Sequence, residues 1–177
     1  GKKSVSGFLD IHGKEVVPFE YDNAESFIYG IAVVSQKGRH FLLDTLGNLR
    51  PIYTRYKNVT VLKPGILLVE LDNLVGFHGL IRYDGSKITP FDYASIYASR
   101  VEHLYVAQKG PFRAPDSYMD QQYRTLIDSS GKVIIPMDYQ EIRVSDNYIS
   151  LERYGKNEGI RHFDLSGKPI TEEMANQ

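Results

Sequence analysis

Residues 7–22 read GFLDIHGKEVVPFEYD, and residues 125–139 read TLIDSSGKVIIPMDY, so that Asp, Gly, Lys, Pro and Tyr recur in the same order and spacing. Looser copies cover 41–56 and 79–93, and a truncated copy covers 163–170. The turn glycines of the five copies lie 34, 38, 46 and 36 residues apart, at positions 13, 47, 85, 131 and 167. This period is typical of a supersecondary unit that is repeated in tandem.

The Asp-x-x-Gly of each copy predicts a tight hairpin between two strands. An Asp carboxylate in such a turn accepts hydrogen bonds from backbone N–H groups two residues further on, and Gly supplies the positive φ that closes a short bulged loop. A Pro follows at the end of the second strand, where its missing N–H costs no ladder hydrogen bond. The aromatic residue after it is predicted to pack against the neighbouring unit, and the four tyrosines in this place are Tyr21, Tyr56, Tyr93 and Tyr139.

The second half of each copy alternates apolar and polar residues around another turn, as in residues 26–35 and 59–69. Each unit is therefore predicted to hold about four short antiparallel strands, which makes the fold all-β. A unit of this size cannot bury its apolar face alone, so the units must stack around a shared core. We expect a single domain over 1–177, stacked as an open solenoid or a propeller-like array, with the open stack favoured. The predicted units are 7–40, 41–78, 79–123, 124–160 and a partial 161–171.

Composition argues against several classes of function. Lys and Arg number 21 against 22 Asp and Glu, and the net charge of -1 is unlike that of a nucleic-acid-binding protein, which needs a basic excess. No run approaches the roughly 18 apolar residues of a membrane span. The chain has no cysteine, which excludes disulfides and thiolate catalysis. It begins at Gly1 rather than Met, which suggests a removed signal segment and favours a periplasmic or extracellular location over the cytoplasm.

The strings Gly7-Phe8-Leu9-Asp10, Gly13-Lys14 and Val16-Val17-Pro18 resemble the bacterial WG-repeat family, whose units carry a Trp-Gly pair before a similar string. The likeness extends over nearly the whole chain, which nevertheless contains no Trp and is therefore a degenerate copy. The positions equivalent to the missing Trp hold Ser6, His40, His78, Arg124 and Ile160. The resemblance implies a bacterial, repeat-built protein that binds or scaffolds rather than catalyses.

The motifs of common enzymes are absent, and we expect no catalytic site and no cofactor. There is no G-x-S-x-G elbow, phosphate loop, H-E-x-x-H or G-x-G-x-x-G before a helix. The histidines lack the close spacing of metal ligands, although His40 and His78 share a repeat position, so we expect no metal site. Asp10, Asp44, Asp128 and Asp164 would form a row of carboxylates able to attract a cation, but hydrogen bonding within each turn explains them and is the interpretation that we adopt.

The longest spacing between turn glycines contains an insertion at residues 111–123. Insertions in repeat proteins collect on the binding face, and tyrosines are enriched at protein interfaces. We therefore expect a protein partner, for example a toxin neutralised by an immunity protein, bound through the insertion and neighbouring tyrosines. The predicted contact residues are Tyr97, Tyr105, Phe112, Arg113, Asp116, Tyr118 and Asp120.

Three alternatives to a protein-binding surface remain. An envelope glycan-binding protein would use the same tyrosines as stacking platforms, with nearby carboxylates accepting hydrogen bonds from sugar hydroxyls. A hydrolase would need a pair of carboxylates across a cleft, such as Asp116 and Asp120, and is the alternative with the least support. The insertion could also be a loop without a role.

Overall fold

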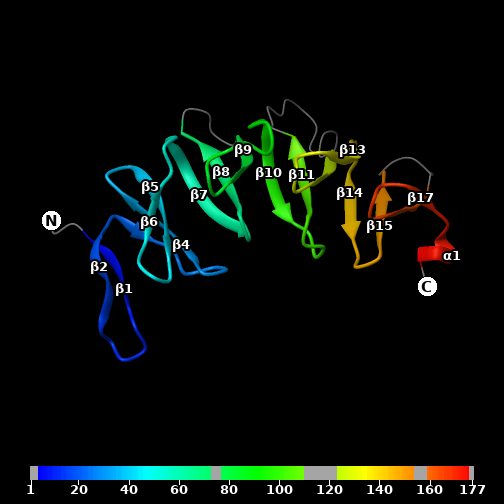
Figure 1. Cartoon of the computed structure of the whole chain (residues 1–177). Coiled ribbons are helices and arrows are strands. Elements are labelled where there is room, and N and C mark those ends of the chain that lie inside the picture. The colour runs from blue at the N-terminus through cyan, green and yellow to red at the C-terminus, as the bar shows by residue number, and fades with distance from the viewer. Residues whose placement is uncertain (1–3, 73–76, 110–122, 154–158, 176–177) are drawn as a thin grey trace. The chain divides into compact units, whose positions relative to one another are not determined.

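The computed structural model describes residues 4–72, 77–109, 123–153 and 159–175, and it confirms an all-β fold of short antiparallel strands (Figure 1). In this part of the chain the strands are followed by one short helix, α1 (Glu172–Ala175). Among the described residues, no helix is long and apolar enough to cross a membrane. The chain divides into two compact units: unit 1 holds residues 1–75 and 80–87, and unit 2 holds residues 76–79 and 88–177. The single domain expected over 1–177 stays a prediction.

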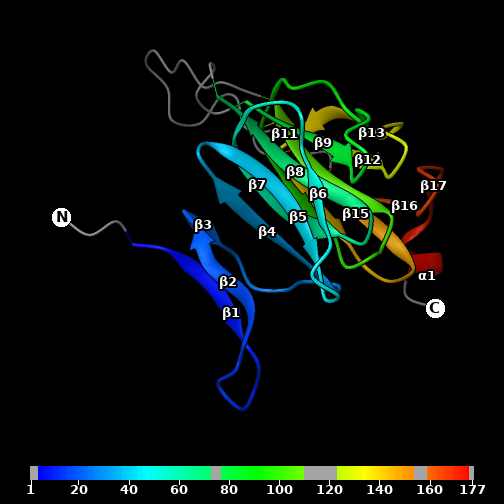
Figure 2. The same ribbon diagram turned by 60° about the vertical axis from the view of Figure 1, so that its left-hand side comes forward.

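Unit 1 begins with a two-stranded ribbon, and a four-stranded meander follows it. The ribbon pairs β1 (Ser6–Leu9) with β2 (Glu15–Tyr21) and lies beside the meander's first two strands (Figure 2). The meander has the order β3 (Asn23–Ala24), β4 (Ile31–Gln36), β5 (Arg39–Asp44) and β6 (Leu49–Pro51). The unit continues with the hairpin of β7 (Tyr56–Lys63) and β8 (Ile66–Leu71), and with Leu80–Arg82 of β9 (His78–Arg82).

Unit 2 contains two further meanders of four strands. The first has the order β10 (Tyr93–Ala98), β11 (Leu104–Lys109), β12 (Arg124–Asp128) and β13 (Val133–Tyr139). The second has the order β14 (Glu141–Val144), β15 (Tyr148–Glu152), β16 (Arg161–Asp164) and β17 (Pro169–Ile170). Prolines lie in the edge strands β6, β13 and β17, as expected of a residue that cannot donate to a ladder.

The turn aspartates have the capping role that the sequence predicts. In each of the four turns, one carboxylate oxygen of the Asp accepts hydrogen bonds from the backbone N–H groups two and four residues further on, at 2.8 to 3.0 Å. The third copy differs, because Arg82 takes the place of the Asp and Asp84 caps Ser86 instead, at 2.9 Å. The four aspartates are Asp10, Asp44, Asp128 and Asp164.

The sheets are out of phase with the sequence repeat. Three Asp–Gly hairpins, β5–β6, β12–β13 and β16–β17, each supply the last two strands of a meander. The first two strands of that meander come from the second half of the preceding copy. The unit boundary expected between residues 123 and 124 therefore falls between β11 and β12, which are hydrogen-bonded neighbours. A repeated pattern fixes the period but leaves the phase open, because one copy does not reveal which strands pair.

The tyrosine that follows each Pro joins one sheet to the next. Tyr21 ends β2 and packs against Ala32 and Val34 of β4 and Leu43 of β5. Tyr139 ends β13 and packs against residues of β14 and β15, namely Ile142, Ile149 and Leu151. Both side chains are buried, with 3% and 7% of their surface exposed. The predicted role of these tyrosines, packing one unit onto its neighbour, is confirmed at both places.

A turn glycine of unit 2, Gly131, tests the packing within that unit, and Gly47 of unit 1 is its matched control. Gly131 and Gly47 have nearly the same backbone, with φ of 88° and 86°. A Cβ at Gly131 would collide with the backbone carbonyl oxygen of Ile88, whereas a Cβ at Gly47 would meet nothing within 4 Å. Both Gly→Ala variants carry the strain of a positive φ, about 1–2 kcal/mol. Gly131→Ala should lose at least about 1 kcal/mol more than Gly47→Ala in urea unfolding, because its neighbour is rigid backbone. Equal losses would contradict the close packing.

The capped aspartates make stability depend on pH. The hydrogen bonds from the side chain and backbone of Asn48 lower the pKa of Asp44. Those from the hydroxyl of Ser166 and the backbone of Lys168 lower the pKa of Asp164. A depressed carboxylate pKa adds stability that is present above the unfolded-state pKa of about 3.9 and is lost as pH falls through the folded value. Urea unfolding between pH 6 and 3 should show stability falling below about pH 4. The variant Asp44→Asn/Asp164→Asn should show a smaller fall, and an identical pH profile would exclude these groups.

Candidate functional site

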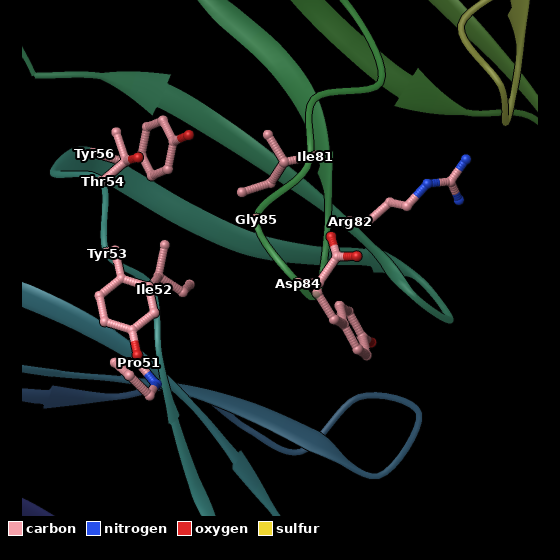
Figure 3. Close-up of a pocket in the computed structure, with 10 residues that line it drawn as sticks. Pro51, Ile52, Tyr53, Thr54, Tyr56, Ile81, Arg82, Asp84 and Gly85 are labelled. Carbon is pink, nitrogen blue, oxygen red and sulfur yellow. The ribbon is translucent and has the colours of Figure 1, made fainter.

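Three adjoining hollows in unit 1 surround the segment between β6 and β7, and we call them together the Pro51 site because all three include Pro51. Their volumes are ≈ 140, ≈ 250 and ≈ 300 Å³. Figure 3 shows the first, in which Ile52 and Tyr53 line one side and Arg82 and Asp84 line the other. The three hollows share walls, since the first shares Pro51–Thr54 with the second and Tyr83 with the third.

The segment is held at both ends and exposed in the middle. Pro51 ends the edge strand β6. Ile52 is buried, and its backbone N–H donates to the carbonyl oxygen of His40 at 2.9 Å. Tyr56 is buried at the start of β7. Between these two anchors Tyr53 exposes 92% of its surface, so the connection presents a large aromatic side chain on a short, fixed stretch of backbone.

Arginines outnumber acidic residues around the Pro51 site. Within the described part of the chain, none of the four arginines that line the hollows makes an ion pair within 4 Å. The two carboxylates of the site, those of Asp44 and Asp84, accept hydrogen bonds from their own turns, and these bonds lower the pKa of both groups. The four arginines are Arg39, Arg50, Arg55 and Arg82. The site therefore has an excess of positive charge with which an acidic group can pair.

His40 adds a polar atom that has no partner among the described residues. It lines the second hollow together with Arg39 and Arg55. Its Nδ1 is buried and makes no hydrogen bond in the described structure. Burial lowers the pKa of His40, so the imidazole is neutral near pH 7. His40 belongs to unit 1 and His78 to unit 2, and the described residues contain no group of three His, Cys, Asp or Glu side chains suited to a metal ion.

Of the contact residues predicted from the sequence, the structure shows one exposed and one buried, and the others lie outside the described residues. Tyr97 lies on β10 with 41% of its surface exposed, and burial of its ring raises the pKa of its hydroxyl. Tyr105 is in the core of β11 with only 1% exposed, so its side chain is not available as a contact. Both faces of β11 are covered, since Leu104, Val106 and Ala107 are buried as well. The predicted residues that lie outside the described part of the chain are Phe112, Arg113, Asp116, Tyr118 and Asp120.

Sequence reasoning missed the Pro51 site, although a spacing indicated it. The Tyr lies three positions after the repeat Pro in three copies, as from Pro18 to Tyr21. In the second copy the step from Pro51 to Tyr56 is five residues. The two additional residues lengthen the connection, and this leaves Tyr53 to Arg55 outside the strands. A lengthened link within a repeat is a sign of a functional surface, as an insertion is.

The chain is similar to one family model and to a solved structure. A solved structure, "Crystal structure of the computationally designed Ika4 protein", is similar to this chain with a TM-score of 0.41 and 14% identity, over 93% of this chain and 99% of that one. No curated protein matches the chain. The model of the WG-containing repeat matches residues 7–39 and 125–156. Each match covers one Asp–Gly hairpin and the first two strands of the next meander. These two stretches of the chain therefore have the form of the WG-containing repeat.

Proposed function

We propose that this chain is a non-catalytic binding module that recognises a protein partner through the Pro51 site. The observation that carries the proposal is Tyr53, whose side chain is 92% exposed between the buried anchors Ile52 and Tyr56. A fixed backbone lowers the entropy that is lost when a partner orders the segment. Tyrosine contributes large contact area for few rotatable bonds, which is why it is frequent among residues that dominate binding energy.

The arginines beside Tyr53 define the kind of partner. Tyr and Arg are enriched at interface hot spots, and Arg pairs with carboxylates through two parallel hydrogen bonds. Arg55 is on the same segment as Tyr53, and Arg39 lies on the wall of the same hollow. An acidic surface of a partner protein fits this arrangement.

The acidic groups of the site support binding rather than catalysis. A general acid or base works best when its pKa lies near the working pH. Asp44 and Asp84 have pKa values below the usual range of a carboxyl, because hydrogen bonds within their own turns stabilise the ionised form. They are therefore poor proton donors and weak bases at neutral pH. In the Pro51 site these carboxylates stabilise the turns.

Two alternatives to this proposal are tested beside it. The insertion at 111–123, together with Tyr97, which is 41% exposed on β10, is a second candidate contact for a protein. A glycan is the alternative ligand of the Pro51 site, because the exposed ring of Tyr53 also has the form of a stacking platform for a sugar. Arg55 and Arg82 would then donate hydrogen bonds to sugar oxygens.

The test is affinity capture from lysate and envelope fractions of the source cells. The double variant Tyr53→Ala/Arg55→Ala should lose the partner at least tenfold, because it removes the aromatic contact and one arginine. Its melting temperature should stay within about 2 °C of the parent, since exposed side chains contribute little to stability. Leu46→Ala is the control, because Leu46 is 85% exposed on a turn of the same sheet and lines none of the three hollows.

A chain that lacks residues 111–122 separates the two protein-binding surfaces. Loss of the partner with this deletion, and full capture by the Tyr53→Ala/Arg55→Ala variant, would place the contact on the insertion and contradict the Pro51 site. A glycan array tests the alternative. Binding to sugars that disappears with Tyr53→Ala, together with no captured protein, would replace the protein partner by a glycan, and an array without signal removes the glycan.

A further inference from the structure

The charged residues that line the second hollow of the Pro51 site are all positive. Arg39 and Arg55 line it, whereas no Asp or Glu among the described residues does. Both arginines are exposed, and neither makes an ion pair with another described residue. Like charges that share one hollow raise the energy of the empty site, and this energy is relieved when an anion binds beside them.

The other two hollows each contain a carboxylate as well as an arginine. Arg82 and Asp84 line the first, and Arg50 and Asp44 line the third. Hydrogen bonds within the turns are the main cause of the lowered pKa of these two carboxyls, and the arginines lower the pKa further. The positive charge of these hollows is thus partly compensated within the protein. An anion from outside therefore gains most in the second hollow.

Uncharged hydrogen-bond donors belong to the same segment. Thr54 lines the second hollow, and its hydroxyl makes no hydrogen bond to another described residue. The backbone N–H groups of Tyr53 and Thr54 make none within the described structure either, whereas that of Ile52 donates to the carbonyl oxygen of His40 at 2.9 Å. Guanidinium, hydroxyl and backbone N–H groups are the donors by which proteins hold phosphate oxygens.

The rest of the lining is apolar and partly aromatic. Phe41, Pro51, Ile52 and Tyr53 line the hollow together with the polar groups. Its volume of ≈ 250 Å³ exceeds the roughly 150 Å³ of a cavity that holds a benzene ring. The hollow therefore has room for an aromatic ring as well as an anionic group. Such a ring covers apolar surface that a small inorganic anion leaves in contact with water.

We propose that the second hollow binds an aryl phosphate, that is, an aromatic ring that carries a phosphate monoester. The monoester has a charge of about −1.5 to −2 at pH 7 and three acceptor oxygens, enough for both Arg39 and Arg55. A carboxylate has a single charge and two oxygens. The inference deepens the proposed function and rests on it for the source of the group, the side chain of a phosphorylated tyrosine in the partner protein. A free aryl phosphate has the same chemistry, and the experiment separates the two sources.

The first measurement is the binding of phenyl phosphate to the intact chain, followed by titration in ¹H–¹⁵N NMR spectra. Ethyl phosphate lacks the ring and benzoate lacks the phosphate, and each should bind at least about fivefold more weakly than phenyl phosphate. The largest shifts should occur at the amides of residues 39–41 and 52–55. Absence of binding by phenyl phosphate would overturn the proposal. So would benzoate or ethyl phosphate that binds as tightly, because the hollow would then not recognise the phosphate or the ring.

Two charge-matched variants assign the binding to the hollow. Arg39→Gln/Arg55→Gln should weaken the binding of phenyl phosphate at least about tenfold, because it removes both charged donors. Arg100→Gln/Arg143→Gln removes the same charge at two exposed arginines of unit 2 and should leave the binding within about threefold. Both variants should melt within about 2 °C of the parent. Equal weakening by the two variants would indicate attraction to the net charge alone and contradict a site in the hollow.

A phosphotyrosine peptide distinguishes the two sources. With acidic residues on both sides of the phosphotyrosine, it should bind at least about tenfold more tightly than phenyl phosphate, because its carboxylates can pair with the other arginines of the Pro51 site. Equal affinity would assign the hollow to a free aryl phosphate and count against a partner protein as the source.

Treatment of the lysate with a tyrosine phosphatase keeps this inference apart from the proposed function. The treatment should abolish affinity capture of the partner. Capture that survives it, together with no binding of phenyl phosphate, would overturn the inference and leave the proposed function intact. Binding of phenyl phosphate without any captured protein would have the reverse meaning.

Discussion

The packing of one tyrosine from each repeat into the following sheet is the interaction on which this architecture depends. Each hairpin ends in an edge strand with a Pro, and three residues later Tyr21 or Tyr139 leaves that sheet and enters the core of its neighbour. Burial of a large aromatic side chain contributes about 2 kcal/mol or more, which a two- or four-stranded unit lacks by itself. Around Tyr139 the contact is reinforced by Arg153, whose guanidinium lies 4.7 Å from the ring centre and pairs with Asp138.

Much of the fold could be predicted from the sequence, because its signals are local. The Asp-x-x-Gly turn, the Pro at the edge and the buried Tyr each depend on chemistry within a few residues, and all three are confirmed. The phase of the sheets could not be predicted, since it depends on hydrogen bonds between one copy and the next. The candidate site was even harder to predict from the sequence than the phase of the sheets. Tyr97 is exposed as expected, but Tyr105 is buried, because both faces of β11 are covered, as its buried neighbours Leu104 and Val106 show.

The proposed Pro51 site arises from a departure from the repeat. Where the link after Pro51 is longer than in the other copies, Tyr53 and Arg55 leave the sheet and remain exposed. The regular copies serve as an internal reference, because they show the connection from Pro to Tyr at its usual length. Function in this chain is therefore sought where the copies differ.

The phase difference between the sheets and the sequence repeat also decides where such a chain can be divided. The repeats that begin at residues 7, 41 and 124 each contribute strands to two sheets. A cut at a repeat boundary can therefore fall inside a sheet, as it does between residues 123 and 124. It separates β11 from β12 across five paired residues and exposes two open edges. Fragments and fusions of this protein are therefore better divided after a tyrosine that follows the repeat Pro, for example between Tyr139 and Glu141, where one sheet ends and the next begins.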